Sequence, residues 1–237
     1  MTTFVVAHGA WGAGWFWKKM HPLMRERGHQ LITPTLTGLG ERHHLAHADV
    51  DLETHLQDLL NVLHFEDLRD IVLVGHSYGG MVATGVADRA SERIRQLVYV
   101  DAFVPRDGQS ALSLMSSAAQ QILLDKVAAQ GDGWRVPANP MPPDSDPADI
   151  AWATPRRMLQ PLKTFTQPLT LTGKVDTLPR TYLYCKVSGP GDVFAQFAQR
   201  ARSQAGWQCF DLDTSHNPHV TTPVHLADLL DQIQARR

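Results

Sequence analysis

The sequence predicts an α/β fold in which a mostly parallel, doubly wound sheet carries an inserted, mainly helical cap. Two observations predict the sheet: apolar runs of strand length recur along the chain, and segments with helical periodicity separate them. A third observation predicts the cap, because one long proline-rich segment interrupts this alternation. The length of 237 residues fits one domain with such an insertion.

Six apolar runs have the length of strands. Several are nearly continuous in hydrophobic residues, which is the pattern of strands that are buried on both faces of a sheet. The six runs are Thr3–Ala7, Gln30–Pro34, Asp70–Gly75, Gln96–Val100, Thr181–Lys186 and Trp207–Leu212.

Helical patterns lie between these runs. Leucines from Leu52 to Leu63 form one apolar stripe, with Asp51 as its expected N-cap. A second stripe starts at Phe194. The last helix is expected to start at Thr222-Pro223, where a capping residue precedes a proline at the first helical position.

The segment 104–178 contains no convincing strand–helix–strand unit. It holds most of the prolines and a helical stretch near Ser113–Gln130. A structureless loop of this length is uncommon inside a compact domain, so we expect a cap subdomain here. Residues 1–103 and 179–237 are then expected to form the core as one domain.

Composition excludes several classes of function. The net charge of −2 gives no basic footprint for nucleic acid and no polybasic patch for a membrane. No apolar segment approaches 18 residues, and the N-terminal run predicts a strand, not a signal peptide. Cys185 and Cys209 are expected in buried strands as core residues and not as a disulfide. These features favour a cytoplasmic protein.

Residues 71–80 read IVLVGHSYGG, an apolar strand that runs into G-x-S-x-G and then into a helix near Met81. This context predicts that Ser77 is a nucleophile on a sharp turn, with its hydroxyl above the sheet. The following helix points its N-terminus at developing negative charge. The alternative is a glycine-rich turn with an incidental serine.

A serine nucleophile needs donors for the oxyanion. The expected donors are the backbone amides of Tyr78, directly after the serine, and of Ala10, in the turn after the first strand. The alternative for the His8-Gly9 stretch is an ordinary turn. Trp11 is a candidate for lining the site, whereas Trp15 and Trp17 are expected to pack the first helix on the sheet.

The base is expected in the loop after the last strand, and both His216 and His219 qualify by position. His216 is favoured because it lies a few residues beyond the strand. His219 is closer to the helix cap, where histidines often only fill the surface. His76, beside the serine, is expected to pack under the turn, and His43, His44 and His47 lack the spacing of a metal site.

The acid that orients the base has two candidates. Asp192 follows the strand at 181–186 after a Gly/Pro turn and is favoured, although it could simply cap the helix at Phe194. Asp101 is the competitor, in VYVDAF at the end of an earlier strand.

These residues resemble the α/β-hydrolases, and among them the group that contains plant hydroxynitrile lyases, plant methylesterases and bacterial esterases of the pyrethroid-hydrolase type. The likeness covers nearly the whole chain. It is carried by FVVAHGAWGAGWFW, TPTLTGLGER, VLVGHSYGGM, VYVDAFVP and GPGDVF…DTSH, and the bacterial branch fits best. The resemblance implies an α/β-hydrolase fold, the triad Ser77, Asp192 and His216, and an oxyanion hole at Ala10 and Tyr78.

The resemblance also separates two reactions. The similar lyases carry a lysine directly after the catalytic histidine and a hydroxyl residue in the first loop, whereas this chain has Asn217 and Gly9. Hydrolysis of a small-molecule carboxylic ester with an apolar or aromatic moiety is therefore favoured, without metal or organic cofactor. A ligand-binding protein on the same fold and a homodimeric assembly stay open. Candidate substrate-binding residues are Trp11, Phe103, Trp134, Trp152 and Phe165, although aromatic residues of the cap could equally form its own small core.

Overall fold

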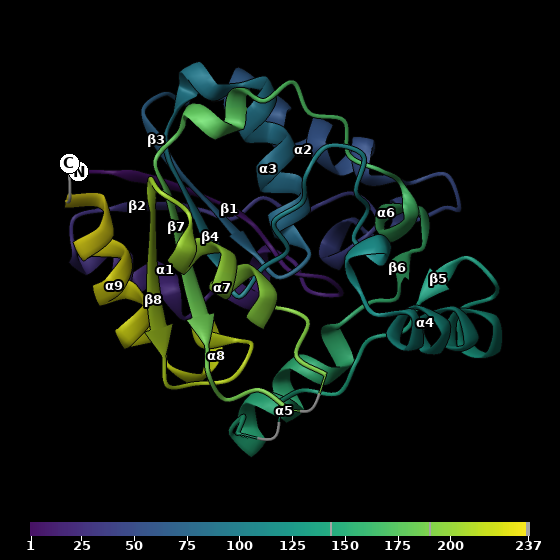
Figure 1. Ribbon diagram of the computed structural model, residues 1–237. Coiled ribbons are helices and arrows are strands. Elements are labelled where there is room, and N and C mark those ends of the chain that lie inside the picture. The colour runs from purple at the N-terminus through teal and green to yellow at the C-terminus, as the bar shows by residue number, and fades with distance from the viewer. Residues whose placement is uncertain (143, 190, 236–237) are drawn as a thin grey trace.

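A central sheet of six parallel strands organises the molecule in the computed structural model, which describes residues 1–142, 144–189 and 191–235 (Figure 1). The strand order is β2-β1-β3-β4-β7-β8, and every pairing in it is parallel. The strands are β1 (Thr3–Ala7), β2 (Gln30–Ile32), β3 (Ile71–His76), β4 (Ile94–Val100), β7 (Arg180–Cys185) and β8 (Trp207–Leu212).

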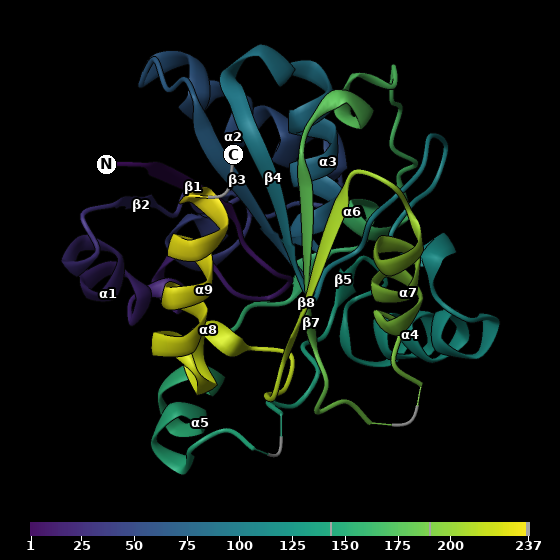
Figure 2. The same ribbon diagram turned by 60° about the vertical axis from the view of Figure 1, so that its left-hand side comes forward.

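Helices cover both faces of this sheet, and each face has its own apolar core. On one face, α2 (Leu52–Phe65), α3 (Gly79–Arg89) and α7 (Ala195–Ser203) share one cluster of buried side chains. On the other face, α1 (Met20–Glu26) and α9 (Pro223–Ala235) pack side by side over a second cluster (Figure 2). In sheets of this kind, the loops that follow the carboxyl ends of the strands usually carry the functional groups.

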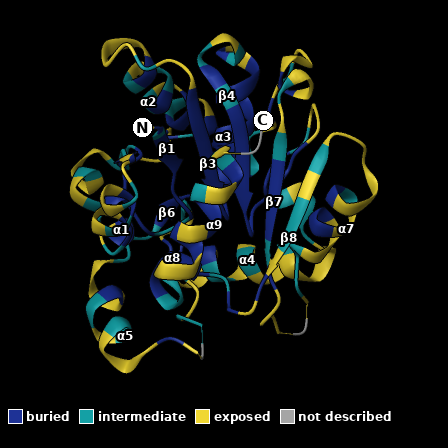
Figure 3. Ribbon diagram, turned by 90° about the vertical axis from the view of Figure 1, so that its left-hand side faces the viewer, coloured by how far each residue is buried: buried dark blue, intermediate teal, exposed yellow. Residues whose placement is uncertain are grey.

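Burial follows the position of a strand in the sheet. All six residues of β3 are buried, whereas β8, at the edge, carries exposed and half-buried residues (Figure 3). The continuous apolar runs thus belong to strands that are covered on both faces, as the pattern predicts.

The six predicted strands are confirmed, with bounds that differ by at most two residues. The helix at Leu52 is confirmed with its cap, since the Asp51 side chain accepts a hydrogen bond of 2.9 Å from the Thr54 amide. The helices expected at Phe194 and Pro223 are α7 and α9. Both cysteines are free, with Cys185 buried.

The described residues between β4 and β7, a stretch here called the β4–β7 connection, contribute no strand to the large sheet. It contains α4 (Ser117–Gln130), which confirms the helix expected there, α5 (Pro147–Ala153) and α6 (Lys163–Thr166). It also holds a small antiparallel pair that was not predicted, β5 (Arg135–Val136) with β6 (Gln160–Pro161). Its treatment as a separate cap subdomain stays a prediction.

Several short elements complete the described chain. The helix α8 (Pro218–Thr221) precedes α9, and the remaining elements are short 3₁₀ helices. These are η1 (Gly14–Trp17), η2 (Gly40–Leu45), η3 (Ser91–Arg93), η4 (Leu112–Leu114), η5 (Thr154–Arg156) and η6 (Lys174–Thr177). Across the described residues, every helix is too short or too polar to cross a lipid bilayer.

Candidate active site

Ser77 occupies the sharp turn between β3 and α3, as the motif predicts. Its backbone is left-handed, with φ of 55°, which is a costly conformation for a residue with a side chain. The close packing of this turn explains Gly79, because a Cβ there would collide with the carbonyl oxygen of Ala7. The turn therefore holds the serine in one position above the carboxyl edge of the sheet.

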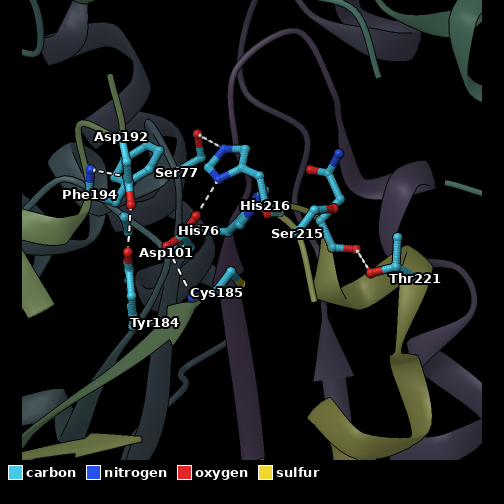
Figure 4. Close-up of polar contacts among 12 residues, drawn as sticks. His76, Ser77, Asp101, Tyr184, Cys185, Asp192, Phe194, Ser215, His216 and Thr221 are labelled. Atoms are coloured by element: carbon cyan, nitrogen blue, oxygen red, sulfur yellow. Dashed lines mark hydrogen bonds and ion pairs between the residues drawn. The ribbon is translucent and has the colours of Figure 1, made fainter. Parts of the chain in front are cut away.

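His216 contacts Ser77 directly. The Ser77 hydroxyl lies 2.8 Å from His216 Nε2, and His216 Nδ1 lies 2.7 Å from Asp101 Oδ2 (Figure 4). Because a carboxylate can only accept, Nδ1 carries the proton and donates it to Asp101, which leaves Nε2 to accept from the serine. This arrangement is a serine–histidine–aspartate chain in the order needed to activate the hydroxyl.

Asp101 is buried directly beyond the end of β4. Its second oxygen accepts a hydrogen bond of 3.3 Å from the amide of Cys185. Burial raises the pKa of the Asp101 carboxyl, while the hydrogen bond from His216 works in the opposite direction and favours the carboxylate. The acid is thus held by two fixed donors at the point where it meets the imidazole.

The preference for Asp192 as the partner of His216 is wrong in this geometry. Its Oδ2 accepts from the Tyr184 hydroxyl at 2.6 Å, and its Oδ1 accepts from the Phe194 amide at 2.8 Å (Figure 4). The reason is the strand order: β4 lies next to β3, so its end is adjacent to the serine. Asp192 lies beyond the end of β7, in the loop that leads to α7, where it fixes the start of that helix region.

The loop that carries His216 is held from several sides. His76 Nε2 donates to the His216 carbonyl at 2.7 Å, and the Ser215 amide donates to Asp144 at 3.0 Å. The Phe194 ring stacks on the imidazole, with centroids 4.8 Å apart and planes 12° apart. His76 therefore packs under the turn, as expected, and supports the base from below.

His219 lies in α8 and is fully buried, so the expectation of a surface or cap position is wrong. Its ring stacks on Trp17 at 4.5 Å, and neither ring nitrogen has a hydrogen-bond partner among the described residues. Burial lowers the pKa of His219 to about 3. It is a neutral aromatic core residue beside the site.

The two amides expected to bind an oxyanion both border the serine. Ala10 and Tyr78 line the same pocket as Ser77, and neither amide is used in a hydrogen bond among the described residues. The loop that holds Ala10 is strained, since Trp11 has φ of 63°. The Trp11 amide donates to Gln160 Oε1 at 3.1 Å, which ties this loop to the β4–β7 connection.

A cavity of about 450 Å³ opens over the serine. Three of the five aromatic candidates line it, namely Trp11, Phe103 and Phe165. Other lining side chains were not singled out from the sequence, because no local pattern marks a side chain as facing the site. They include Phe16, Met115, Met141, Arg157, Val193 and Phe194.

The other two aromatic candidates lie elsewhere, so their assignment to the pocket is wrong. Trp152, on α5, packs edge-on against Trp15 at 5.0 Å. Trp134 precedes β5, where Arg135 lies over its ring at 5.1 Å. Trp152 therefore packs on the core of the large sheet and not in a small core of its own segment, whereas Trp134 contacts Arg135 of its own segment.

Family comparison identifies the chain over nearly its whole length. Residues 4–228 match the model of the alpha/beta hydrolase family. The carbendazim hydrolyzing esterase of Nocardioides sp. (strain SG-4G) is 39% identical over 245 residues, which cover 97% of this chain and 98% of that protein. Methylesterase 9 of Arabidopsis thaliana is 33% identical over 106 residues, 44% of this chain and 41% of that protein.

Solved structures show the same fold. An extracellular alpha/beta-hydrolase from a Paenibacillus species superposes with a TM-score of 0.85 at 23% identity, and the match covers 98% of each chain. The pyrethroid hydrolase PytH superposes with a TM-score of 0.77 at 20% identity, over 100% of this chain and 98% of that one. The resemblance inferred from the motifs is therefore confirmed.

Proposed function

Since the chain belongs to the alpha/beta hydrolase family, we propose that it is a serine hydrolase that cleaves carboxylic esters through an acyl-enzyme. One observation carries the proposal: Ser77, His216 and Asp101 form a continuous hydrogen-bonded chain beside a cavity of about 450 Å³. An esterase that aligns with nearly all of this chain supports an ester bond as the substrate bond.

In the first half of the reaction, His216 Nε2 takes the proton of the Ser77 hydroxyl as the oxygen attacks the ester carbonyl. The carbonyl oxygen becomes an oxyanion, which the amides of Ala10 and Tyr78 stabilise. The imidazolium that forms is stabilised by Asp101. His216 then gives the proton to the departing alcohol, and the acyl group stays on Ser77.

In the second half, water takes the place of the alcohol. His216 accepts a proton from the water as its oxygen attacks the acyl carbon, and the serine recovers that proton when the acid leaves. The aromatic walls formed by Trp11, Phe103 and Phe165 favour an apolar or aromatic moiety in the substrate.

A cyanohydrin lyase is the second candidate on this fold, and the geometry speaks against it. A Cβ on Gly9 would lie 2.7 Å from His76 Nδ1 and 3.1 Å from the Ser77 Cβ. The turn therefore has no room at this position for the hydroxyl residue expected of such a lyase. Asn217, after the base, also supplies no positive charge to a departing anion.

The test is hydrolysis of p-nitrophenyl butyrate by the Ser77→Ala variant. We expect kcat/KM to fall by a factor of about 10⁴ or more, because the covalent route is lost. Ser203→Ala, a change at an exposed serine on α7, is the matched control and should keep its activity.

A fluorophosphonate probe adds an independent readout. It should label the native protein and the Ser203→Ala variant but not Ser77→Ala. Turnover that survives Ser77→Ala would overturn the mechanism, and a native protein that resists labelling would favour a ligand-binding role instead.

A further inference from the structure

The cavity over Ser77 is mostly apolar but contains one arginine. Arg157 lies between η5 and β6, and among the described residues that line this cavity it carries the only permanent charge. Its neighbour Met158 donates its amide to the Trp11 carbonyl at 3.0 Å, so the backbone of this stretch is fixed against the loop of the oxyanion amides.

The guanidinium of Arg157 has no acidic partner among the residues that the structure describes. Its Nη1 donates to the Asn139 carbonyl at 2.5 Å, and its Cζ lies 5.6 Å from the centroid of the Trp11 ring. Its Nε is buried without a hydrogen-bond partner, and no described carboxylate forms an ion pair with it. Other arginines of the protein, such as Arg42 and Arg89, do have carboxylate partners.

This arrangement is costly for the free protein. Withdrawing a guanidinium from water disfavours its charged form, and burial lowers the pKa of Arg157 with no neighbouring acid to offset the effect. A ligand of opposite charge offsets the desolvation cost of an unpaired charge that is partly buried in a cavity. A carboxylate is the natural complement, since its two oxygens match the fork of the guanidinium.

The position of Arg157 also indicates which part of a substrate would reach it. The alcohol must leave beside His216 Nε2, which supplies its proton, and Phe194 stacks on that imidazole. Arg157 lines the same cavity and lies over the ring of Trp11, which directly follows Ala10 in its loop. An acyl part that fills the rest of this cavity therefore comes within reach of Arg157.

We propose that Arg157 determines specificity by binding a carboxylate on the acyl part of the substrate, so that monoesters of dicarboxylic acids are the preferred substrate class. This inference rests on the proposed ester hydrolysis at Ser77. Arg157 binds and positions the substrate, while the bond-making steps remain those of Ser77 and His216.

The test compares matched pairs of esters on the same enzyme. Monomethyl esters of dicarboxylic acids of increasing length are assayed against methyl alkanoates of equal length, for example monomethyl adipate against methyl hexanoate, by titration of released acid. For the native protein we expect the carboxylate-bearing ester to have the higher kcat/KM at the best chain length. In Arg157→Met the ratio of the two kcat/KM values should fall about 10- to 100-fold, the worth of a hydrogen-bonded charge pair.

Two further variants separate charge from geometry. Arg157→Lys should recover part of the ratio, because it keeps the charge but loses the planar fork. Arg156→Met is the matched control: Arg156 is the exposed neighbour, bonds to the Trp152 carbonyl and does not line the cavity, so the ratio should stay native. Because each ratio compares two esters on one variant, a general loss of activity cancels.

A binding measurement keeps the inference testable without turnover. Calorimetric titration of monomethyl adipate into Ser77→Ala should give a Kd at least about tenfold lower than into Ser77→Ala/Arg157→Met. An equal Kd in the two proteins, or a native preference for the uncharged ester at every length, would overturn the role of Arg157. Failure of the esterase proposal would look different, as hydrolysis of all esters that persists in Ser77→Ala.

Discussion

The carboxyl edge of the large sheet and the β4–β7 connection contribute different parts of one site. Ser77 and Asp101 directly follow β3 and β4, and His216 comes a few residues after β8. The connection contributes cavity walls such as Phe165 and Arg157. The hydrogen-bonded chain of Ser77, His216 and Asp101 thus follows the ends of sheet strands. The cavity wall comes partly from the connection and partly from residues outside it, such as Trp11 and Phe194.

The two regions also differ in how they are held. At the sheet edge, Asp101 and His216 are joined by hydrogen bonds to each other and to buried backbone groups. In the connection, α4 buries only Val127 among its residues. Contacts between the regions include the backbone of Trp11, which bonds to Gln160 and Met158, and the Ser215 amide, which donates to Asp144. Hydrogen bonds therefore fix the Ser77–His216–Asp101 chain at the sheet edge, whereas few buried side chains hold α4 in the connection.

After the loss of the nucleophile itself, replacing the acid should have the largest effect at this edge. We expect Asp101→Asn to lower kcat by a factor of about 10⁴, because an amide in place of the carboxylate no longer holds the imidazole in the required tautomer or stabilises its cation. The measurement is steady-state hydrolysis of p-nitrophenyl butyrate by a variant whose unfolding transition is checked by circular dichroism.

Asp192→Asn is the matched control for this change. Asp192 accepts from Tyr184 and Phe194 and has no bond to His216, so the loss of kcat should stay below about tenfold. A larger loss in Asp192→Asn than in Asp101→Asn would show that the acid is supplied from beyond β7 and not from the end of β4.

These two acids mark the limit of what the sequence predicts about the site. The strands, the serine turn and the choice of His216 follow from local patterns, because hydrophobic runs and glycine spacing are properties of short segments. The acid depends on which strand end lies nearest the imidazole. Asp101 and Asp192 both follow strands, and local spacing does not measure the distance across a sheet.

The residues of the cavity wall are even harder to predict from the sequence. Trp134 and Trp152 were expected in the pocket with Phe165, and only Phe165 lines it. The sequence did not predict that Arg157 lines the cavity, because an arginine in a polar stretch ordinarily faces water. Whether such a side chain faces the site depends on how the connection crosses the sheet edge, which is a tertiary property.

The next prediction concerns the junction of the two regions, which is the contact between the Trp11 loop and Gln160. Gln160 is fully buried, accepts from the strained Trp11 loop and donates to Thr164 Oγ1 at 2.8 Å. We expect Gln160→Met, which keeps the volume but removes the acceptor, to lower kcat about tenfold, the worth of one hydrogen bond, with a smaller change in KM. The reason is that the loop of Ala10 loses its anchor.

The control for that change is Gln167→Met. Gln167 is also in the connection and accepts from the Glu53 amide at 2.8 Å, on the side of α2 and outside the cavity lining. It should lower the unfolding temperature without changing kcat. If both variants lost only stability, the junction would have a structural role and no part in positioning the oxyanion loop.

The smallest expected effect is on the pH dependence of the free energy of unfolding. It again distinguishes the sheet from the β4–β7 connection. Burial lowers the pKa of His8 and His55 to about 4 and that of His219 to about 3, and it also lowers that of His76. The segment 104–178 contains no histidine.

The unfolded chain binds protons on these histidines below about pH 6.5. In the folded chain His8, His55 and His219 bind them only near pH 3 to 4, and the pKa of His76 is also lowered. The stability present at neutral pH is therefore lost as the pH falls through this window. Each such histidine contributes about 1 kcal/mol per pH unit to that slope.

His219→Phe tests this slope at a single residue. The phenyl ring keeps the stack on Trp17 and removes two buried nitrogens without partners, so the variant should lose about one histidine's share of the pH dependence. Urea unfolding between pH 7 and pH 5 measures the slope. His64→Phe, at an exposed position on α2, should leave it unchanged. An unchanged slope in His219→Phe would mean that protonation of other groups causes the loss of stability at low pH. The buried edge of the sheet would then contribute no more to the pH dependence than the connection does.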